Sequence, residues 1–303
     1  MLHLLSGCMM NSRRNSRLGW CVALVASMLV GTACDNVATG DVTVTMSGGD
    51  GTQRGLPDTL FQDGWSVQFN RYLVSLGDFT LTSASGEVHT SDRHVLVDVQ
   101  KGDIPLAELK GLPAGRWDVG FRVSPPEART ELADGQVSAD DLAMMRERGF
   151  SYFVEGRAVK AGVGVLTFRM GFPVDALMKD CINGVDGTQG IVVPEASVAE
   201  AEVTIHAEHM FYDRLGTHKG VQLRFDAIAA TAGSDGVITP EGLASQQLTD
   251  LRGRDGQELK DAQGQPVVYL PGAYDVRTLQ EFITQSIVDQ AHLNGGGVCT
   301  VVK

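Results

Sequence analysis

The segment TIHAEHMFYD, from Thr204 to Asp213, holds the residues of this chain that are best suited to chemistry. His206 and His209 stand three positions apart, with Glu208 between them and Met210 directly after. Imidazoles combined with carboxylates are typical ligands of zinc, and imidazoles combined with a thioether are typical of copper. We therefore consider His206 and His209 as ligands of copper or zinc.

The geometry of this site depends on where a strand ends. Val203 and Ile205 alternate with Glu202 and Thr204, as in a strand with one buried face. Positions i and i+3 of a strand lie on opposite faces, so the two histidines share an ion only if the chain bends near Glu208. If the strand continues without a bend, His206 is a solvated histidine and His209 is a buried one. Five further candidate ligands are not brought together by the sequence: His89, His94, His218, Glu208 and Asp213.

Two related segments carry half of a calcium-loop pattern. DGQVSADDL (134–142) and DGVITPEGL (235–243) share D-G-x-(V/I)-(S/T)-x-(D/E)-x-L, which resembles the second half of an EF-hand loop and its exit helix. Asp134, Asp141 and Asp235 supply oxygen atoms, but Leu132 and Gly242 occupy positions where a calcium loop needs ligands. We expect turns followed by capped helices, and no calcium.

The motifs of common enzyme classes are absent from the sequence. It contains no GxSxG, HExxH or P-loop, and GVGV at 162–165 is better explained as a hairpin turn. We therefore expect no enzymatic activity.

Short stretches with a two-residue rhythm dominate the rest of the chain. Apolar residues alternate in 42–46, 95–99 and 117–123, and a hairpin is predicted over 151–174 with its turn near KAGVG. Gly-rich and Pro-containing turns separate these stretches. The pattern predicts a mainly β fold, an antiparallel β-sandwich with short helical insertions and a C-terminal helix.

Three helices are predicted within this β framework. The first, near 138–149, is indicated by an N-cap at Ser138. The second, near 239–251, is indicated by Pro240 at a first helical position. The third, near 275–294, places Leu279, Phe282, Ile283 and Ile287 on one face.

The first 33 residues read as a bacterial lipoprotein signal peptide. Three arginines precede an apolar run, Gly19 to Val30, which is short for a transmembrane helix. LVGTAC then places Cys34 where a lipoprotein is acylated, with Gly31 where leucine is usual, so cleavage after Ala33 without lipid is the alternative. We expect residues 34–55 to hold the acylated Cys34, a tether and the first strand, and 56–303 to form one domain.

The remaining cysteines and charges fit an exported protein. Cys181 and Cys299 are the pair left after Cys8, Cys21 and Cys34, and we predict a disulfide between them. Residues 1–33 hold three of the 25 basic residues and no acid, so the net charge changes from −12 to −15 on their removal. This charge argues against nucleic acid as a partner. The expected contacts are a membrane, through the lipid, and an unidentified protein or metal.

Three segments in the middle of the chain resemble the MbnP-like periplasmic proteins, which are associated with copper and methanobactin. These segments are LPAG (112–115), GFSYFVEG (149–156) and FRMG (168–171). The resemblance implies an exported β-sandwich that binds copper. It carries over no ligands, because no Trp-x-His motif stands in this sequence.

The sequence thus predicts a lipid-anchored protein of the bacterial cell envelope that serves as a non-catalytic binding or assembly module. The alternative is a periplasmic metal-binding protein that uses His206 and His209.

Overall fold

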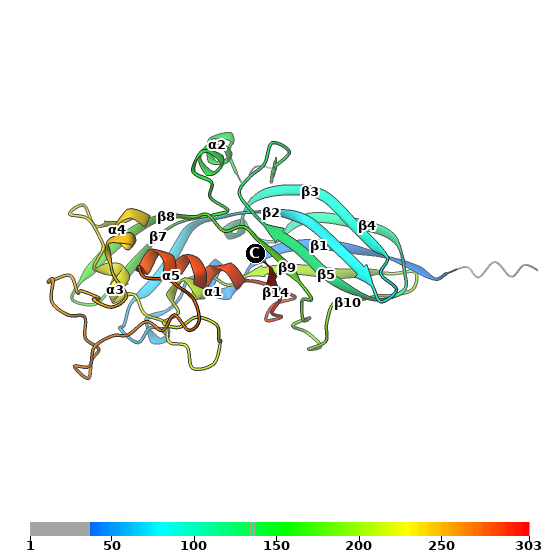
Figure 1. The fold of residues 1–303 in the computed structure, drawn as a ribbon. Coiled ribbons are helices and arrows are strands. Elements are labelled where there is room, and N and C mark those ends of the chain that lie inside the picture. Colours follow the sequence, from blue (N-terminus) through cyan, green and yellow to red (C-terminus); the bar gives the residue numbers. More distant parts are fainter. Residues whose placement is uncertain (1–36, 134, 136, 303) are drawn as a thin grey trace, which may run out of the picture. The chain divides into compact units, whose positions relative to one another are not determined.

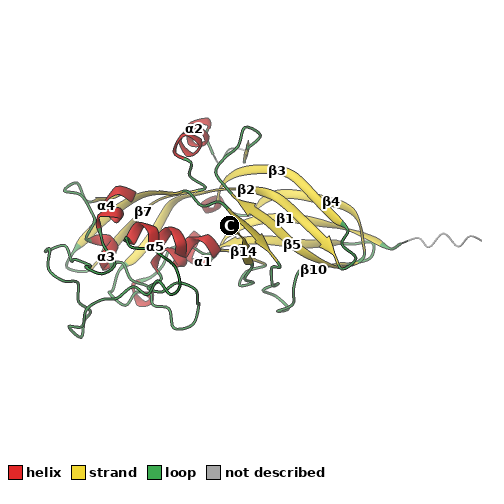
Figure 2. Cartoon of the chain, in the orientation of Figure 1, coloured by secondary structure: helices red, strands yellow, loops and turns green. Residues whose placement is uncertain are grey.

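The computed structural model describes residues 37–133, 135 and 137–302, and the folded part begins at Val37 as one compact unit. It is mainly β, as predicted (Figure 1; Figure 2). The strands are β1 (Thr39–Gly48), β2 (Ser66–Ser83), β3 (Val88–Asp98), β4 (Ile104–Pro113), β5 (Gly115–Val123), β6 (Glu131–Leu132), β7 (Tyr152–Lys160), β8 (Gly164–Phe172), β9 (Ala176–Lys179), β10 (Ile191–Val193), β11 (Val198–Ile205), β12 (Val237–Ile238), β13 (Ala291–Leu293) and β14 (Thr300–Val302).

The helices of the described residues are short. The α-helices are α1 (Asp50–Arg54), α2 (Ala139–Arg148), α3 (Asp226–Ala229), α4 (Pro240–Ser245) and α5 (Leu279–Ser286). The 3₁₀-helices are η1 (Asp58–Leu60), η2 (Val99–Lys101), η3 (Ala207–Phe211) and η4 (Ile287–Asp289).

The strands form two sheets. The smaller has the order β13-β11-β1-β4, and the larger, strongly curled sheet has the path β12-β8-β7-β2-β5-β9-β14, with β3, β6 and β10 attached to it. Most neighbours are antiparallel, but β1 pairs with β11 in parallel, so the sheets are mixed rather than purely antiparallel. Because β1 lies between β11 and β4, the first strand is an integral part of the folded unit.

The long strand β2 organises the larger sheet. Its first half pairs with β7 and its second half with β5, and β3 runs along its other edge. The register shifts at Gly77, where a Cβ atom would lie 2.6 Å from the carbonyl oxygen of Arg93, and the next residue, Asp78, has a φ of 54°. Only glycine tolerates this close approach of two backbones.

One continuous apolar core lies within the fold, and a small second cluster lies under α2. Leu73, Leu96, Met145 and Phe153 form this second cluster, so α2 is held to the sheet through Met145. The helix begins as predicted, because Ser138 and Asp141 form a reciprocal capping box, and it ends at Gly149 in the left-handed conformation.

Two predicted helices are shorter than their sequence patterns suggested. α4 begins after Thr239 but ends at Ser245, where the side chain of Gln246 bonds the backbone of Arg252 and turns the chain back. α5 covers only the middle of 275–294. Residues 291–293 leave the helix because their backbone groups pair with β11, and this pairing makes them strand β13.

The predicted disulfide between Cys181 and Cys299 is confirmed. It closes a loop across 118 positions and lies beside β14, which pairs with β9. The bridge therefore fixes the segment that follows β13 to the larger sheet.

Candidate functional site

The chain turns sharply at the end of β11. Strand pairing stops at Ile205, and residues 207–211 form the 3₁₀-helix η3. Met210 and Phe211 are buried, and the ring of Phe211 packs edge-on against Phe61, which fixes the turn to the core. The alternation of residues 202–205 therefore ends with the strand at Ile205, and the turn brings the ring centroids of His206 and His209 to 6.3 Å from each other.

His206 is fully engaged in hydrogen bonds. Its Nδ1 lies 2.9 Å from a carboxylate oxygen of Glu208, and its Nε2 donates to the carbonyl oxygen of Gly295 at 3.0 Å. Burial alone would lower the pKa of His206, but the hydrogen bond and charge of Glu208 outweigh burial and raise it. Since both partners are acceptors, His206 is satisfied as an imidazolium and has no nitrogen left for an ion.

Three other histidine rings gather beside His206. Ring centroids are separated by 5.2 Å between His209 and His218, 5.3 Å between His209 and His292, and 6.0 Å between His218 and His292. The rings come from η3, from the loop before α3, and from β13. We call these three residues the histidine triad.

His292 is the unusual member of the triad. It is 6% exposed, and neither ring nitrogen has a hydrogen-bond partner among the described residues. Burial, followed by the charges of the neighbouring histidines, lowers the pKa of His292 to about 3. The ring is thus neutral at ordinary pH, with a lone pair free on one nitrogen. A buried polar group without a partner is costly and calls for a functional explanation.

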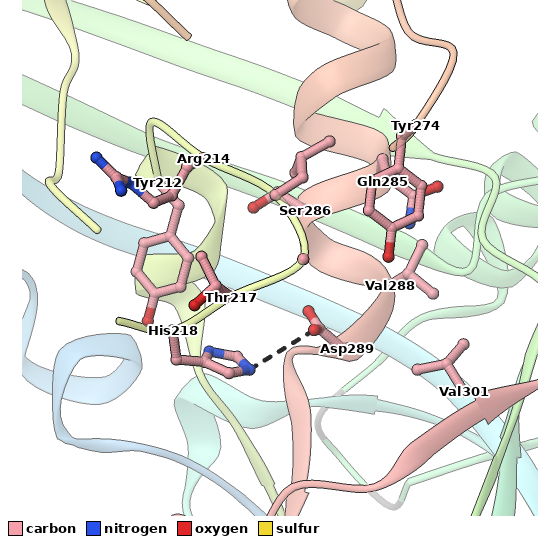
Figure 3. A pocket seen from close by; sticks show the side chains of 12 residues that line it. Tyr212, Arg214, Thr217, His218, Tyr274, Gln285, Ser286, Val288, Asp289 and Val301 are labelled. Carbon is pink, nitrogen blue, oxygen red and sulfur yellow. Dashed lines mark ion pairs between the residues drawn. The ribbon is translucent and has the colours of Figure 1, made fainter. Parts of the chain in front are cut away.

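Asp289 links the other two members of the triad. One oxygen lies 3.2 Å from Nδ1 of His209. The other lies 3.7 Å from Nε2 of His218, and Figure 3 marks this ion pair. Burial would raise the pKa of Asp289, but the hydrogen bond and charge of His209 outweigh it and lower that pKa. When this carboxylate accepts a hydrogen bond from Nδ1–H of His209, the lone pair on Nε2 of the same ring can coordinate an ion. A carboxylate bonded to the second nitrogen is the usual arrangement around metal-bound histidine.

Backbone contacts hold these segments in place. Ser286 donates to the carbonyl oxygen of His209 at 2.6 Å, and the backbone N–H of His206 donates to the carbonyl of Gln290 at 2.9 Å. On the other side, His292 is opposite Thr204 in the antiparallel pairing of β13 and β11. The site is therefore built where α5, η4 and β13 dock on the end of β11.

The spacing of the triad suits a tetrahedral ion. A ring nitrogen lies about 2.0–2.1 Å from bound zinc, which places two tetrahedrally arranged ring centroids about 5.2 Å apart. The observed separations of 5.2, 5.3 and 6.0 Å are close to this value. Within the described ranges, no group of three His, Cys, Asp or Glu side chains is arranged so that it could hold an ion. An ion would be bound only after the rings rotate about χ2, which is a soft torsion.

The other sequence candidates have partners elsewhere. His89 contacts Glu87 and Trp117, and His94 is bonded to Ser124 and Thr130. Asp213 pairs with Arg214 and Arg224.

Of the calcium-like residues, Asp141 serves the cap of α2 and an ion pair with Arg71, and Asp235 accepts from the backbone N–H of Val237. Asp134 and Cys34 lie outside the described residues.

Sequence reasoning missed His292 and Asp289 altogether. Both fell within the predicted helix 275–294, where a 3.6-residue rhythm hid the change to strand. The one available signal was AHL at 291–293, an alternating run just before Gly295 to Gly297.

The chain matches no known protein family, no curated protein and no solved structure. Within the described part of the chain, every helix is too short or too polar to cross a lipid bilayer.

Proposed function

We propose that this protein is an exported, non-catalytic metal-binding protein whose ion is held by His209, His218 and His292. The observation that carries the proposal is the ring of His292, which is buried against three other imidazoles without a hydrogen-bond partner among the described residues. Asp289 supports the proposal as a positioning residue, because it orients His209 and His218.

The ligand set favours zinc or copper(II). Three imidazoles bind both ions well, and divalent affinities rise towards copper. Met210 is buried in the core on the same turn as His209, and nothing in the contacts of the described residues directs its sulfur to the triad. We therefore propose nitrogen ligation and assign no thioether. His206, which the sequence pairs with His209, is replaced as a ligand by His218 and His292.

The location and fold class are part of the same proposal. The signal-like first 33 residues and Cys34 support a lipid anchor in the bacterial cell envelope, and the Cys181–Cys299 disulfide is in keeping with an oxidising compartment. The mixed sheets are compatible with a β-sandwich of the kind that the MbnP-like resemblance implies. Labelled fatty acid should enter the wild type and not Cys34→Ala.

The test of metal binding uses residues 35–303, which lack the signal peptide and the lipid-bearing Cys34, purified without metal. Calorimetric titration with Zn²⁺ and Cu²⁺ should give one ion per chain, and His209→Ala and His218→Ala should each weaken binding at least about tenfold. His89→Ala is the matched control, because His89 lies on β3 and contacts Glu87. If the protein takes up no stoichiometric ion, the metal-binding proposal is wrong, and a binding or assembly module without metal is the better explanation.

A further inference from the structure

Four half-exposed valines lie at one end of the folded unit, and we call this end the valine end. They are Val37, Val88, Val192 and Val198, with exposed fractions of 64%, 56%, 51% and 55%. Apolar side chains left in water at this level lose free energy that a nearby apolar surface could restore.

Strand β1 brings three of these valines together. Val37 precedes β1 by one residue, and the carbonyl oxygen of Thr39, the first residue of β1, accepts from the backbone N–H of Ala196 at 2.8 Å. Ala196 belongs to the loop between β10, which holds Val192, and β11, which begins at Val198. The start of the folded chain is therefore bonded to the segment that joins the other two valines.

The larger sheet brings Val88 to the same end. Val88, the first residue of β3, is opposite Thr82 near the end of β2. Thr82 is opposite Asp118 of β5 on its other side, and Arg116 of the same strand is opposite Val192. Figure 1 shows β10 and the start of β1 at this end.

The hairpin of β7 and β8 occupies the opposite end (Figure 1). Val159 of this hairpin is opposite Ser66, the first of the 18 residues of β2, whereas the valine end lies at the last of them, Ser83. Val165 is opposite Val159 in the hairpin and is 60% exposed. Exposed valines alone therefore do not distinguish one end from the other.

The position of the expected lipid distinguishes the two ends. Cys34 stands three residues before Val37. Three residues of fully extended chain span at most about 11 Å, so an acylated Cys34 keeps Val37 within that distance. The valine end is therefore the part of the folded unit that such an anchor holds nearest to the lipid.

The charges at the valine end favour an apolar contact over an electrostatic one. Lys110 and Arg116 are basic residues of this end, and their partners are Glu108 at 3.0 Å and Asp186 at 3.8 Å. The chain as a whole is acidic, so anionic headgroups repel it. Contact with a bilayer would thus come from the valines.

We propose that the valine end lies on the membrane that holds Cys34, with its valine side chains among the acyl chains just below the headgroups. The inference rests on the proposed lipid anchor, and it adds which part of the folded unit meets the bilayer and through which side chains. The hairpin of β7 and β8 is then directed away from the membrane.

The test adds one tryptophan to the acylated protein, which is reconstituted in phosphatidylcholine vesicles with brominated acyl chains that quench indole fluorescence on contact. Val198→Trp is far from Cys34 in sequence but belongs to the valine end, and Val165→Trp is the matched control on the hairpin. The wild type, whose Trp65 and Trp117 are buried, gives the background.

We expect the two variants to differ clearly. The added tryptophan should lose at least about half of its emission in Val198→Trp and less than about a tenth in Val165→Trp, since indoles at a membrane interface lie among the lipids. Val192→Trp should repeat the result of Val198→Trp, so that a folding defect in one variant leaves the other to decide. Equal quenching at the two ends would overturn the inference.

A charged substitution separates apolar contact from proximity alone. Adding Val192→Asp to Val198→Trp should lower the quenching at least about twofold, because a carboxylate does not enter the acyl region without a large cost. Adding Val165→Asp to the same variant should leave the quenching unchanged. If Val192→Asp has no effect, the valines do not enter the lipid and the proposed contact is wrong.

Labelled fatty acid distinguishes failure of this inference from failure of the anchor. A chain that takes up no label at Cys34 overturns the anchor and the membrane contact with it. A labelled chain whose Val198→Trp and Val165→Trp variants are quenched alike keeps the anchor and overturns the membrane contact alone.

Discussion

Two buried histidines in this molecule have opposite surroundings. His94, on β3, is 1% exposed, and its ring nitrogens lie 3.1 Å from the hydroxyl of Ser124 and 2.9 Å from that of Thr130. His292, on β13, is nearly as buried, but its nitrogens contact no hydrogen-bonding group among the described residues. Burial lowers the pKa of both rings, so both are neutral at ordinary pH.

The difference teaches how to separate a structural histidine from a ligand. A buried imidazole with two hydroxyl partners is fully accounted for by the fold, because its hydrogen bonds offset the loss of water. A buried imidazole with none weakens the fold unless something else binds it. Both rings are buried and both pKa values are lowered, so the hydrogen-bond partners are the feature that distinguishes them.

The largest expected effect is on metal affinity. His292→Ala should weaken Zn²⁺ binding at least about a hundredfold, because it removes one of three ligands, whereas His94→Ala should leave the affinity within about twofold. Calorimetric titration of the two variants measures both. Equal losses in the two variants would break the comparison.

In the metal-free protein, replacing these two histidines should affect stability in the opposite order: His94 should matter more than His292. His94→Leu should lower the free energy of unfolding by about 1–3 kcal/mol, since it strands a buried hydroxyl of Ser124. His292→Leu should be neutral or stabilising, because it removes an unsatisfied polar ring. Urea unfolding in the presence of a chelator gives both values, and a clear destabilisation by His292→Leu would contradict the assignment.

Asp289 lies outside the triad, and replacing it tests whether the orientation of His209 matters for metal affinity. Asp289→Asn keeps the size of the side chain but loses the charge that fixes the tautomer of His209, so Zn²⁺ affinity should fall about 10- to 100-fold. Asp175→Asn, which removes the partner of Arg122 on the larger sheet, is the control and should have no effect on the affinity.

A further effect is expected on the acid sensitivity of the metal-free protein. The folded pKa of His292, about 3, lies below its ordinary value of 6.5, so the unfolded chain binds the extra proton between these two values. Stability is therefore lost as the pH falls from 6.5 towards 3, by about 1 kcal/mol per unit for this group. His292→Leu should flatten that slope in unfolding curves measured between pH 6 and 4.

The pKa of His206 is shifted in the opposite direction, so replacing His206 provides the control for this pH dependence. Its pKa is raised in the folded state, so its contribution is complete below the ordinary value and is lost as the pH rises through the raised one. His206→Gln should therefore leave a protein whose stability declines less on the alkaline side of neutrality, with the acid slope unchanged.

Local rules predicted much of the fold. The two-residue rhythm of Val95 and Val97 and the capping spacing of Ser138 and Asp141 act over a few residues, so they can be interpreted from sequence alone. The predicted strand ends at Asp98, because Val99 begins η2. The Cys181–Cys299 pairing followed from elimination. Each of these predictions needs no knowledge of distant neighbours.

The site could be predicted only in part, because its members meet through long-range pairing. The local sequence identified His209 as a candidate ligand, but the turn that positions it depends on the packing of Phe211 against Phe61. His292 lies beside β11 only because residues 291–293 leave the helical pattern and join the smaller sheet. A one-residue difference in that register would turn its ring to the other face.

The position of β13 along the chain also determines when an ion can first be captured. A ribosome must have passed His292 before the third imidazole exists, whereas β1 to β11 precede it and include every strand of the smaller sheet except β13. The proposed ion would therefore bind only once β13 has joined β11, and it would stabilise that docking.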